Sequence, residues 1–286
     1  MRVKQSDCTD AEEQKIFSKY LIDLGDGNIP ISEEHGEFAI PIDDRLAFSE
    51  NKVRDLVNWV FPNIREHIQD PVWLSERAIL CPTNKEIDEV NEILTESFPG
   101  EPHVFYSADS TPDDGSEYIY STEFLNTLCP SGLPPHKMTL KVGMVIMLLR
   151  NFNQKLGQCN GSRFVLEEIC SRVLVARSIT GTHTGRILLI PRIPLSPSEK
   201  VFPFTLVRRQ FPIRPCFAMT INKAQGQGLK QVGLYCSKEI FAHGQLYVAT
   251  SRVGRFSNIK VLALNKQTTE KQTHINNVVY KEILSL

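Results

Sequence analysis

The pattern of a parallel α/β sheet occurs in this chain at two places far apart. In the first, the apolar run 78–81 predicts a short buried strand, and helical periodicity then continues to residue 94. Thr83 and Glu86 have the spacing of a capping box at the start of that helix. In the second, strands are predicted at 216–221, 232–236 and 259–264, and a helix at 245–251. A buried strand that leads into a capped helix is the building unit of parallel α/β sheets, so both places are expected in one such domain.

The residues between these two places have a different pattern. Short strand-like runs occur at 142–149, 163–169, 172–177, 186–190 and 204–210. Turn signals such as Asn160-Gly161 separate the runs, and strands of this length and spacing are typical of a small barrel or sandwich. Residues 99–135 show no clear periodicity and are predicted to form loops. The chain is therefore expected to be an α/β domain interrupted by an all-β insertion, with segments 1–121, 122–213 and 214–286.

The composition excludes several classes of protein. The seven Cys are scattered and odd in number, with no C-x-x-C pair, which indicates reduced thiols in an intracellular protein. The seven His are equally dispersed, so the spacings predict no metal site. There is no apolar run of about 18 residues, and the N-terminus lacks the apolar segment of a signal peptide. We therefore expect neither a membrane span nor secretion.

The net charge of −1 conceals an uneven distribution along the chain. Residues 1–136 contain 10 Lys and Arg against 27 Asp and Glu, whereas residues 137–230 contain 15 against 3. A basic block of this kind can neutralise phosphates and raise the affinity for nucleic acid. Solvated surface on a sheet-rich domain explains it equally well, so the charge pattern alone does not decide between the two.

Residues 218–229 form the most informative segment. An apolar strand leads there into the turn Lys-Ala-Gln-Gly-Gln-Gly at 223–228. Glycines let backbone N–H groups approach a phosphate closely, and Thr, Lys and Gln add side-chain donors. Taken alone, the segment is more often an ordinary polar turn.

A second segment, 244–253, predicts an apolar helix with Arg252 near its end. Such an arginine can meet a transferring phosphate from across a cleft. For an isolated instance, however, an arginine that covers the carboxyl end of a helix is commoner.

Taken together, the two segments resemble motifs five and six of superfamily-one helicases, in the form found in the petite integration frequency (PIF) family and its Helitron-like branch. The resemblance spans most of the chain and is strongest over 78–94 and 138–265. It implies a RecA-like second motor lobe of the P-loop NTPase type, interrupted at 122–213 by a small SH3-like β-barrel of the family's 2B type. Ala224 and Gly228 depart from the Ser and Thr common at these positions, but the Gln-Gly-Gln core is intact.

The resemblance also implies roles at a nucleotide. Intact members of the family unwind DNA in the 5′ to 3′ direction and use ATP and Mg²⁺. Arg252 would be the arginine finger on the γ-phosphate, and Arg2 would be a second γ-phosphate contact. Gln225, Gly226 and Gln227 would line the nucleotide cleft and couple it to DNA.

The partners implied by the resemblance are single-stranded DNA and duplex junctions. Thr220 and Lys223 would lie near the DNA backbone. Thr83 and Asn84 would contact a phosphate at the start of a helix, although a capping role explains Thr83 better. Asn160 would face DNA from a loop of the insertion, and an ordinary hairpin turn also explains it.

Parts of the family's motor are not found in this sequence. The P-loop pattern G-x-x-x-x-G-K-[ST] does not occur, and we find no acidic pair of the kind that holds Mg²⁺ beside it. Met1-Arg2 matches the end of motif four. We therefore expect the N-terminal motor lobe to be missing and the chain alone to be inactive as an ATPase.

Two alternatives stay open on the sequence alone. The first is a catalytically dead module that binds single-stranded DNA through the basic block at 137–230. The second is a transposon fragment with no selected role. For localisation, the sequence favours an intracellular protein, with the nucleus preferred over the mitochondrion.

Overall fold

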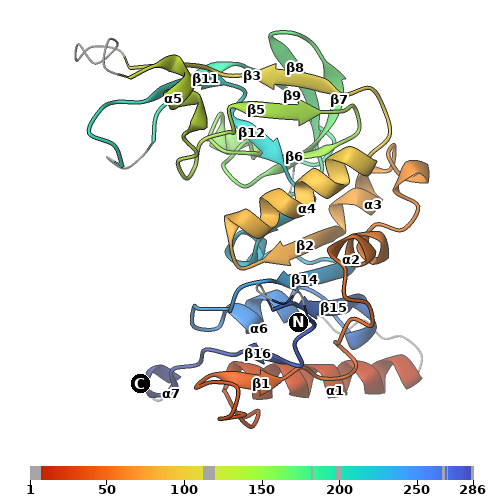
Figure 1. Ribbon diagram of the computed structural model, residues 1–286. Helices are drawn as coiled ribbons and strands as arrows, with labels where there is room; N and C mark the ends of the chain where they lie inside the picture. The colour runs from red at the N-terminus through yellow and green to blue at the C-terminus, as the bar shows by residue number, and fades with distance from the viewer. Residues whose placement is uncertain are drawn as a thin grey trace. The chain divides into compact units, whose positions relative to one another are not determined.

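The computed structural model describes residues 8–111, 120–181, 183–197, 201–265, 268 and 270–284 (Figure 1). The chain divides into two compact units. The first contains the described residues of Met1–Ile64, Glu76–Leu94 and Phe217–Leu286, and the second contains those of Arg65–Ser75 and Thr95–Cys216. The chain therefore leaves the first unit and returns to it twice.

The first unit contains a four-stranded sheet in the order β13-β2-β14-β15, with every neighbouring pair parallel. Its strands are β2 (Arg77–Cys81), β13 (Ala218–Thr220), β14 (Gln231–Cys236) and β15 (Ile259–Ala263). Apart from their first residues, β2 and β14 are buried along their length, as expected for strands covered on both faces. The strands predicted at 78–81, 232–236 and 259–264 are confirmed, and the one predicted at 216–221 is shorter.

Helices pack closely against this sheet (Figure 1). Gly233 lets the helix that contains Leu56 and Val60, α2 (Val53–Val60), approach β14 closely. A Cβ at this position would stand 2.9 Å from Cγ2 of Val60 and 3.1 Å from Cγ of Leu56. A two-stranded antiparallel pair, β1 (Ala39–Pro41) and β16 (His274–Asn276), belongs to the same unit. The helices of the unit are α1 (Cys8–Gly25), α2 (Val53–Val60), α4 (Asn84–Ser97, up to Leu94), α6 (Gln245–Thr250) and α7 (Lys281–Leu284).

Asn91 fixes helix α4 to strand β13 at the edge of the sheet. Its side chain is buried, and its Oδ1 accepts hydrogen bonds from the N–H groups of Phe217 (3.1 Å) and Ala218 (3.0 Å). An edge strand leaves backbone groups without a ladder partner, and a buried group of this kind needs one. The amide of Asn91 therefore holds in place the strand that leads to Thr220.

The second unit consists mainly of antiparallel strands. Its largest sheet has the order β12-β6-β7-β8-β9. These strands are β6 (Val145–Leu148), β7 (Arg163–Ile169), β8 (Val173–Ser178), β9 (Ile187–Pro191) and β12 (Ile213–Pro215). The bounds of β7, β8 and β9 agree with the predicted runs to within one residue. The other elements are α3 (Pro71–Ser75), β3 (His103–Tyr106), β4 (Ala108–Ser110), α5 (Thr122–Thr127), β5 (Lys137–Leu140), β10 (Ile193–Leu195) and β11 (Val207–Gln210).

The prediction of loops for 99–135 is wrong in part, because this stretch contains β3, β4 and α5. β3 pairs with β5, and β4 pairs with β11, whose residue Val207 lies opposite Ser110. Strands of three or four residues are specified by such distant partners rather than by their own periodicity. β3 and β4 thereby belong to the segment Thr95–Cys216 of the second unit.

Candidate functional site

The carboxyl edge of the parallel sheet brings together three residues singled out from the sequence. Thr220 ends β13 and lies opposite Cys81, the last residue of β2. Thr83 and Asn84 follow β2 at the same edge, where α4 begins. Asn84 is exposed, whereas Thr83 and Thr220 are half-buried. Parallel strands end at a common edge, so residues far apart in the sequence meet there.

Glu86 organises this edge from within helix α4. One carboxylate oxygen accepts hydrogen bonds from the N–H group (3.0 Å) and the hydroxyl (2.8 Å) of Thr83. The other accepts from the N–H group (2.6 Å) and hydroxyl (2.9 Å) of Ser237 and from the N–H group of Lys238 (2.9 Å). Because the Glu86 residue is only 2% exposed, its carboxylate is a buried junction between the loops that follow β2 and β14.

A capping box has two hydrogen bonds, and the one predicted between the Glu86 side chain and the Thr83 backbone is confirmed. Glu86 accepts from the Thr83 N–H group, as that motif requires. The Thr83 hydroxyl donates to the same carboxylate. The link from Glu86 to Ser237 was not predicted, and its one sequence signal is an acidic residue on the apolar side of an amphipathic helix.

The turn after β13 is held by its own backbone. A short 3₁₀ helix, η4 (Ile221–Ala224), follows the strand, and the Gln227 N–H group donates to the carbonyl of Ala224 (3.0 Å). Gly226 has a φ of 80°, which glycine adopts at little cost. Lys223, Gln225 and Gly226 are exposed, so the turn presents the predicted residues to solvent.

Arg252 follows the C-terminal end of helix α6 and binds that end. Its Nε donates to the carbonyl of Val248 (2.7 Å), and its Nη2 donates to the hydroxyl of Ser251 (2.7 Å). These are the contacts of an arginine that covers a helix carboxyl end. The structural role that is commoner for a lone arginine, covering the carboxyl end of a helix, is therefore present in the structure.

Arg252 also binds the turn that follows β13. Its Nη1 donates to the carbonyls of Ala224 and Gln227, both at 3.3 Å, and its own carbonyl accepts from the N–H group of Leu229 (2.9 Å). Four of the five guanidinium N–H groups are thus bonded within the chain. Partial burial lowers the pKa of Arg252 from its ordinary value, but an arginine stays charged at neutral pH. The structure joins the two segments that the sequence marked as a pair.

Asn160 belongs to the second unit, apart from the residues above. It is exposed in the turn before β7, and its N–H group donates to Oδ1 of Asn151 (2.8 Å). Gly161 follows with a φ of 90°, and its N–H group donates to the carbonyl of Leu148. A tight turn therefore accounts for the Asn-Gly pair. Arg2 lies outside the described residues.

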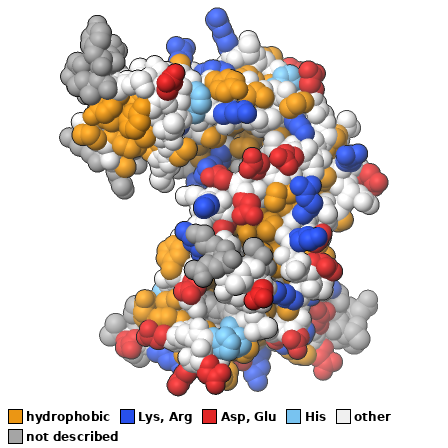
Figure 2. Space-filling view, viewed as in Figure 1, with side chains coloured by type: hydrophobic (Ala, Val, Ile, Leu, Met, Phe, Trp, Pro, Cys, Tyr) orange, Lys and Arg blue, Asp and Glu red, His pale blue; other side chains and the backbone are white. Residues whose placement is uncertain are grey.

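Some basic residues of the block 137–230 lie in the interior of the second unit. Arg163 and Arg208 are completely buried, and Lys141 is 8% exposed. Nε and Nη2 of Arg208 bind the carboxylate of Asp109, and Arg163 donates to the carbonyls of Leu74 and Ser75. On the face shown in Figure 2, Lys and Arg side chains are interspersed with Asp and Glu. These three charges of the block thus lie in the interior of the unit and not on its surface.

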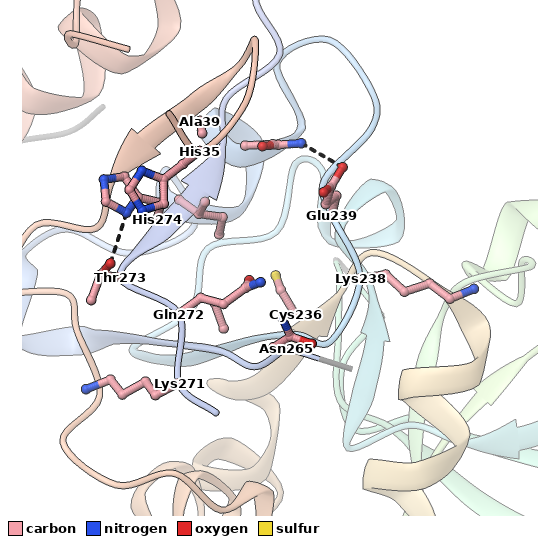
Figure 3. A pocket seen from close by; sticks show the side chains of 13 residues that line it. His35, Ala39, Cys236, Lys238, Glu239, Asn265, Lys271, Gln272, Thr273 and His274 are labelled. Carbon is pink, nitrogen blue, oxygen red and sulfur yellow. Dashed lines mark hydrogen bonds between the residues drawn. The ribbon is translucent and has the colours of Figure 1, made fainter. Parts of the chain in front are cut away.

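A pocket of about 300 Å³ lies beside the ends of β14 and β15 (Figure 3). His35 and His274 stack there with ring centroids 3.7 Å apart, and Asn276 donates to Glu239 (3.1 Å). None of the residues predicted from the sequence lines this pocket. Among the described residues, no three His, Cys, Asp or Glu side chains are grouped to hold a metal ion.

No helix in the part of the chain that the structure describes is long and apolar enough to cross a membrane. The parallel sheet with flanking helices makes the first unit a mixed α/β unit, with the arginine-bound turn at the carboxyl edge of the sheet. The family model described as "DNA helicase Pif1, 2B domain" matches residues 123–169, which lie in the second unit.

Curated helicases resemble a larger part of the chain. The ATP-dependent DNA helicase PIF1 of Xenopus laevis is 27% identical over 203 residues, which are 68% of this chain and 29% of that protein. The human ATP-dependent DNA helicase PIF1 is 29% identical over 198 residues, which are 64% of this chain and 26% of that protein. The matches thus cover less than a third of these relatives.

A solved structure supports the fold. The crystal structure of Bacteroides Pif1 bound to ssDNA has a TM-score of 0.51 at 18% sequence identity, covering 86% of this chain and 56% of that one. At this identity the likeness shows the fold alone. In sequence, the chain is thus similar to PIF1 helicases over the regions that the family model and the curated relatives cover.

Proposed function

We propose that this chain is the second motor lobe, with its inserted domain, of an ATP-dependent helicase that unwinds DNA in the 5′ to 3′ direction. The observation that carries the proposal is the bonding of Arg252 to the turn after β13. This contact joins the residue that would sense the nucleotide to the turn that would touch DNA. Since the chain spans less than a third of the helicases named above, the activity is proposed for the complete motor.

In this proposal, ATP and Mg²⁺ are held by a P-loop lobe, whose sequence pattern does not occur in this chain. Arg252 reaches the γ-phosphate from the opposite wall and stabilises the charge that develops there during hydrolysis. Gln225, Gly226 and Gln227 line the same wall, and Arg2 supplies a second phosphate contact. The exposure of Gln225 and Gly226 supports this assignment.

Arg252 would also couple the nucleotide to the turn. Because four of its N–H groups are bonded within the chain, the guanidinium must exchange some of these bonds for phosphate oxygens. The bonds to Ala224 and Gln227 are the longest, at 3.3 Å, and are the ones we expect to break. Their release would free the turn to change its position when ATP binds.

Single-stranded DNA and duplex junctions are the proposed partners. Thr220 and Lys223 would lie near the backbone of one strand, and Thr83 and Asn84 would contact a phosphate at the start of α4. Their common place at the carboxyl edge supports this arrangement for the two threonines and Asn84. Asn160 would contribute from the second unit, which we propose to be the SH3-like 2B domain. We place the protein in the nucleus rather than the mitochondrion.

The experiment that tests this function begins with the transcript that encodes the chain. The proposal predicts a P-loop lobe in the same reading frame and negligible ATP turnover by the 286-residue chain alone. ATP hydrolysis by the pure chain would contradict the proposed division of labour. A transcript without a P-loop lobe would exclude the helicase assignment for this protein.

A second candidate is a module that binds single-stranded DNA without using a nucleotide. The observation that favours it is the internal bonding of Arg252, which has the contacts of a structural helix cover. Such a module would bind single-stranded oligonucleotide with a strong salt dependence and no response to ATP. An ATP-dependent change in that affinity, measured on the complete reading frame, would rule it out.

A further inference from the structure

The second unit contains an open groove lined by arginines from three separate segments of the chain. Its volume is about 740 Å³, and its polar lining comes from Arg172, Arg192, Arg209 and Ser171. The remaining lining residues are Ala108, Val173 and Pro191, so no carboxylate of the described residues lines the groove. Arg172 lies between β7 and β8, Arg192 between β9 and β10, and Arg209 in β11.

The alternation of residues along β11 puts one arginine inside and the next one out. Arg208 is completely buried against Asp109 of β4, whereas Arg209 is exposed and pairs with Ala108. Successive strand residues point to opposite faces of a sheet. The one acidic side chain of β4 is therefore neutralised in the interior, and the groove receives Arg209 beside a small alanine.

Arg192 is held in a fixed position at the groove. Its Nη1 donates to the carbonyl of Tyr106 (3.0 Å). Its guanidinium carbon lies 5.3 Å from the ring centre of Phe105 and 5.1 Å from that of Phe211. Aromatic faces attract a guanidinium, so these contacts anchor the group without cancelling its charge. The guanidinium therefore loses little side-chain freedom when an anion binds.

The side chains of Arg172 and Arg209 have no hydrogen bond or ion pair among the residues that the structure describes, and both residues are exposed. Three positive charges, with no carboxylate among the described lining residues, suit an anion with several charged groups in a row. A guanidinium binds phosphate oxygens through two parallel N–H groups. The groove is much larger than the space for one small ion, since a water molecule occupies about 30 Å³.

We propose that this groove binds the phosphodiester backbone of single-stranded DNA, through Arg172, Arg192 and Arg209. The inference rests on the proposed function and adds a contact site within the second unit. It is separate from the turn at Asn160, which does not line the groove.

The test measures the binding of a fluorescent oligothymidylate to the 286-residue chain over a range of salt concentrations. Arg172→Glu and Arg209→Glu are compared with Arg186→Glu, an exposed arginine in the turn at the other end of the β8–β9 hairpin. All three variants reverse the same charge in the same unit. None of the three side chains has a partner among the described residues, so the fold is expected to be unchanged by circular dichroism.

Each groove variant should reduce the slope of log affinity against log salt by about 0.7, and raise the Kd roughly fivefold near 0.1 M salt. Arg186→Glu should leave both quantities close to those of the parent chain. If the groove variants and Arg186→Glu behave alike while the parent chain binds DNA, the groove is not the site, and the proposed function stands. If the parent chain binds no oligonucleotide, both ideas fail.

Inorganic pyrophosphate separates a DNA backbone from a small phosphate ligand. Binding of pyrophosphate that weakens in the groove variants, without any change for the oligonucleotide, would show a small-anion site and overturn the proposal.

Discussion

At the scale of single residues, buried polar side chains hold the carboxyl edge of the parallel sheet together. Glu86 accepts five hydrogen bonds from two loops, and Arg252 bonds a helix end to a turn. Burial strengthens such contacts but makes the loss of one partner expensive. These residues therefore fix the arrangement of the loops at this edge.

Replacing Glu86 by Gln is expected to lower the free energy of unfolding by about 2–4 kcal/mol. An amide has one oxygen acceptor, so it cannot accept from both Thr83 and Ser237 as the carboxylate does. Urea denaturation measures the effect. Glu92→Gln, an exposed change in the same helix, is the control and should stay within about 0.5 kcal/mol of the parent. A similar small effect of Glu86→Gln would contradict the junction.

The buried thiols at the same edge should be unreactive. Desolvation, with a smaller effect of the Glu86 carboxylate, raises the pKa of both Cys81 and Cys236 well above the ordinary value for a thiol. The thiolate is the nucleophile, so both stay protonated and shielded at pH 8. Alkylation followed by mass spectrometry should modify the exposed Cys129 and Cys170 first. Modification of Cys81 or Cys236 at the same rate in native protein would show that the edge is open.

At the scale of elements, the second unit depends on a buried ion pair between β4 and β11. Arg208 and Asp109 are both inaccessible, and Arg208 also donates to the carbonyls of Pro134 (3.1 Å) and Leu125 (3.2 Å). One side chain thus connects α5, β4, β11 and the loop before β5. The hydrogen bonds of this guanidinium hold distant segments of the chain in register.

Arg208→Met is expected to destabilise the protein by about 3–5 kcal/mol, because it leaves the Asp109 carboxylate buried without a partner. The double change Arg208→Met with Asp109→Leu should recover most of this loss, since it removes both charges. Chemical denaturation of the two single variants and the double variant gives the coupling energy. An Arg208→Met variant as stable as the parent would show that the pair contributes nothing.

The elements also show which parts of the fold could be predicted from the sequence. Strands β2 and β14 could be predicted because each contains an apolar run with clear limits, and the local sequence is enough to find it. β3 and β4 could not, because their partners β5 and β11 lie far away in the chain. The importance of Arg252 and of the turn at 225–227 was expected from a family resemblance, but the hydrogen bonds that join them were not predicted. The interior roles of Arg163 and Arg208 did not follow, since a charged residue is expected at the surface.

At the scale of the whole molecule, the two units present different surfaces. The first presents the arginine-bound turn and the carboxyl edge of a RecA-like sheet, and the second presents an arginine-lined groove. Neither unit contains a P-loop pattern, so chemistry on ATP is expected only when a P-loop lobe faces Arg252. DNA binding by the chain alone is expected without ATP.

The most direct test of the central claim is DNA-stimulated ATP hydrolysis by the protein of the complete reading frame, with Arg252→Ala compared with the parent. Arg186→Ala, at an exposed position, is the control. If Arg252 stabilises the transferring phosphate, kcat should fall by about 10³-fold or more, with oligonucleotide affinity within about twofold of the parent. A kcat close to that of the parent would show that Arg252 only covers the end of its helix, and the account of this chain as the second motor lobe would be wrong.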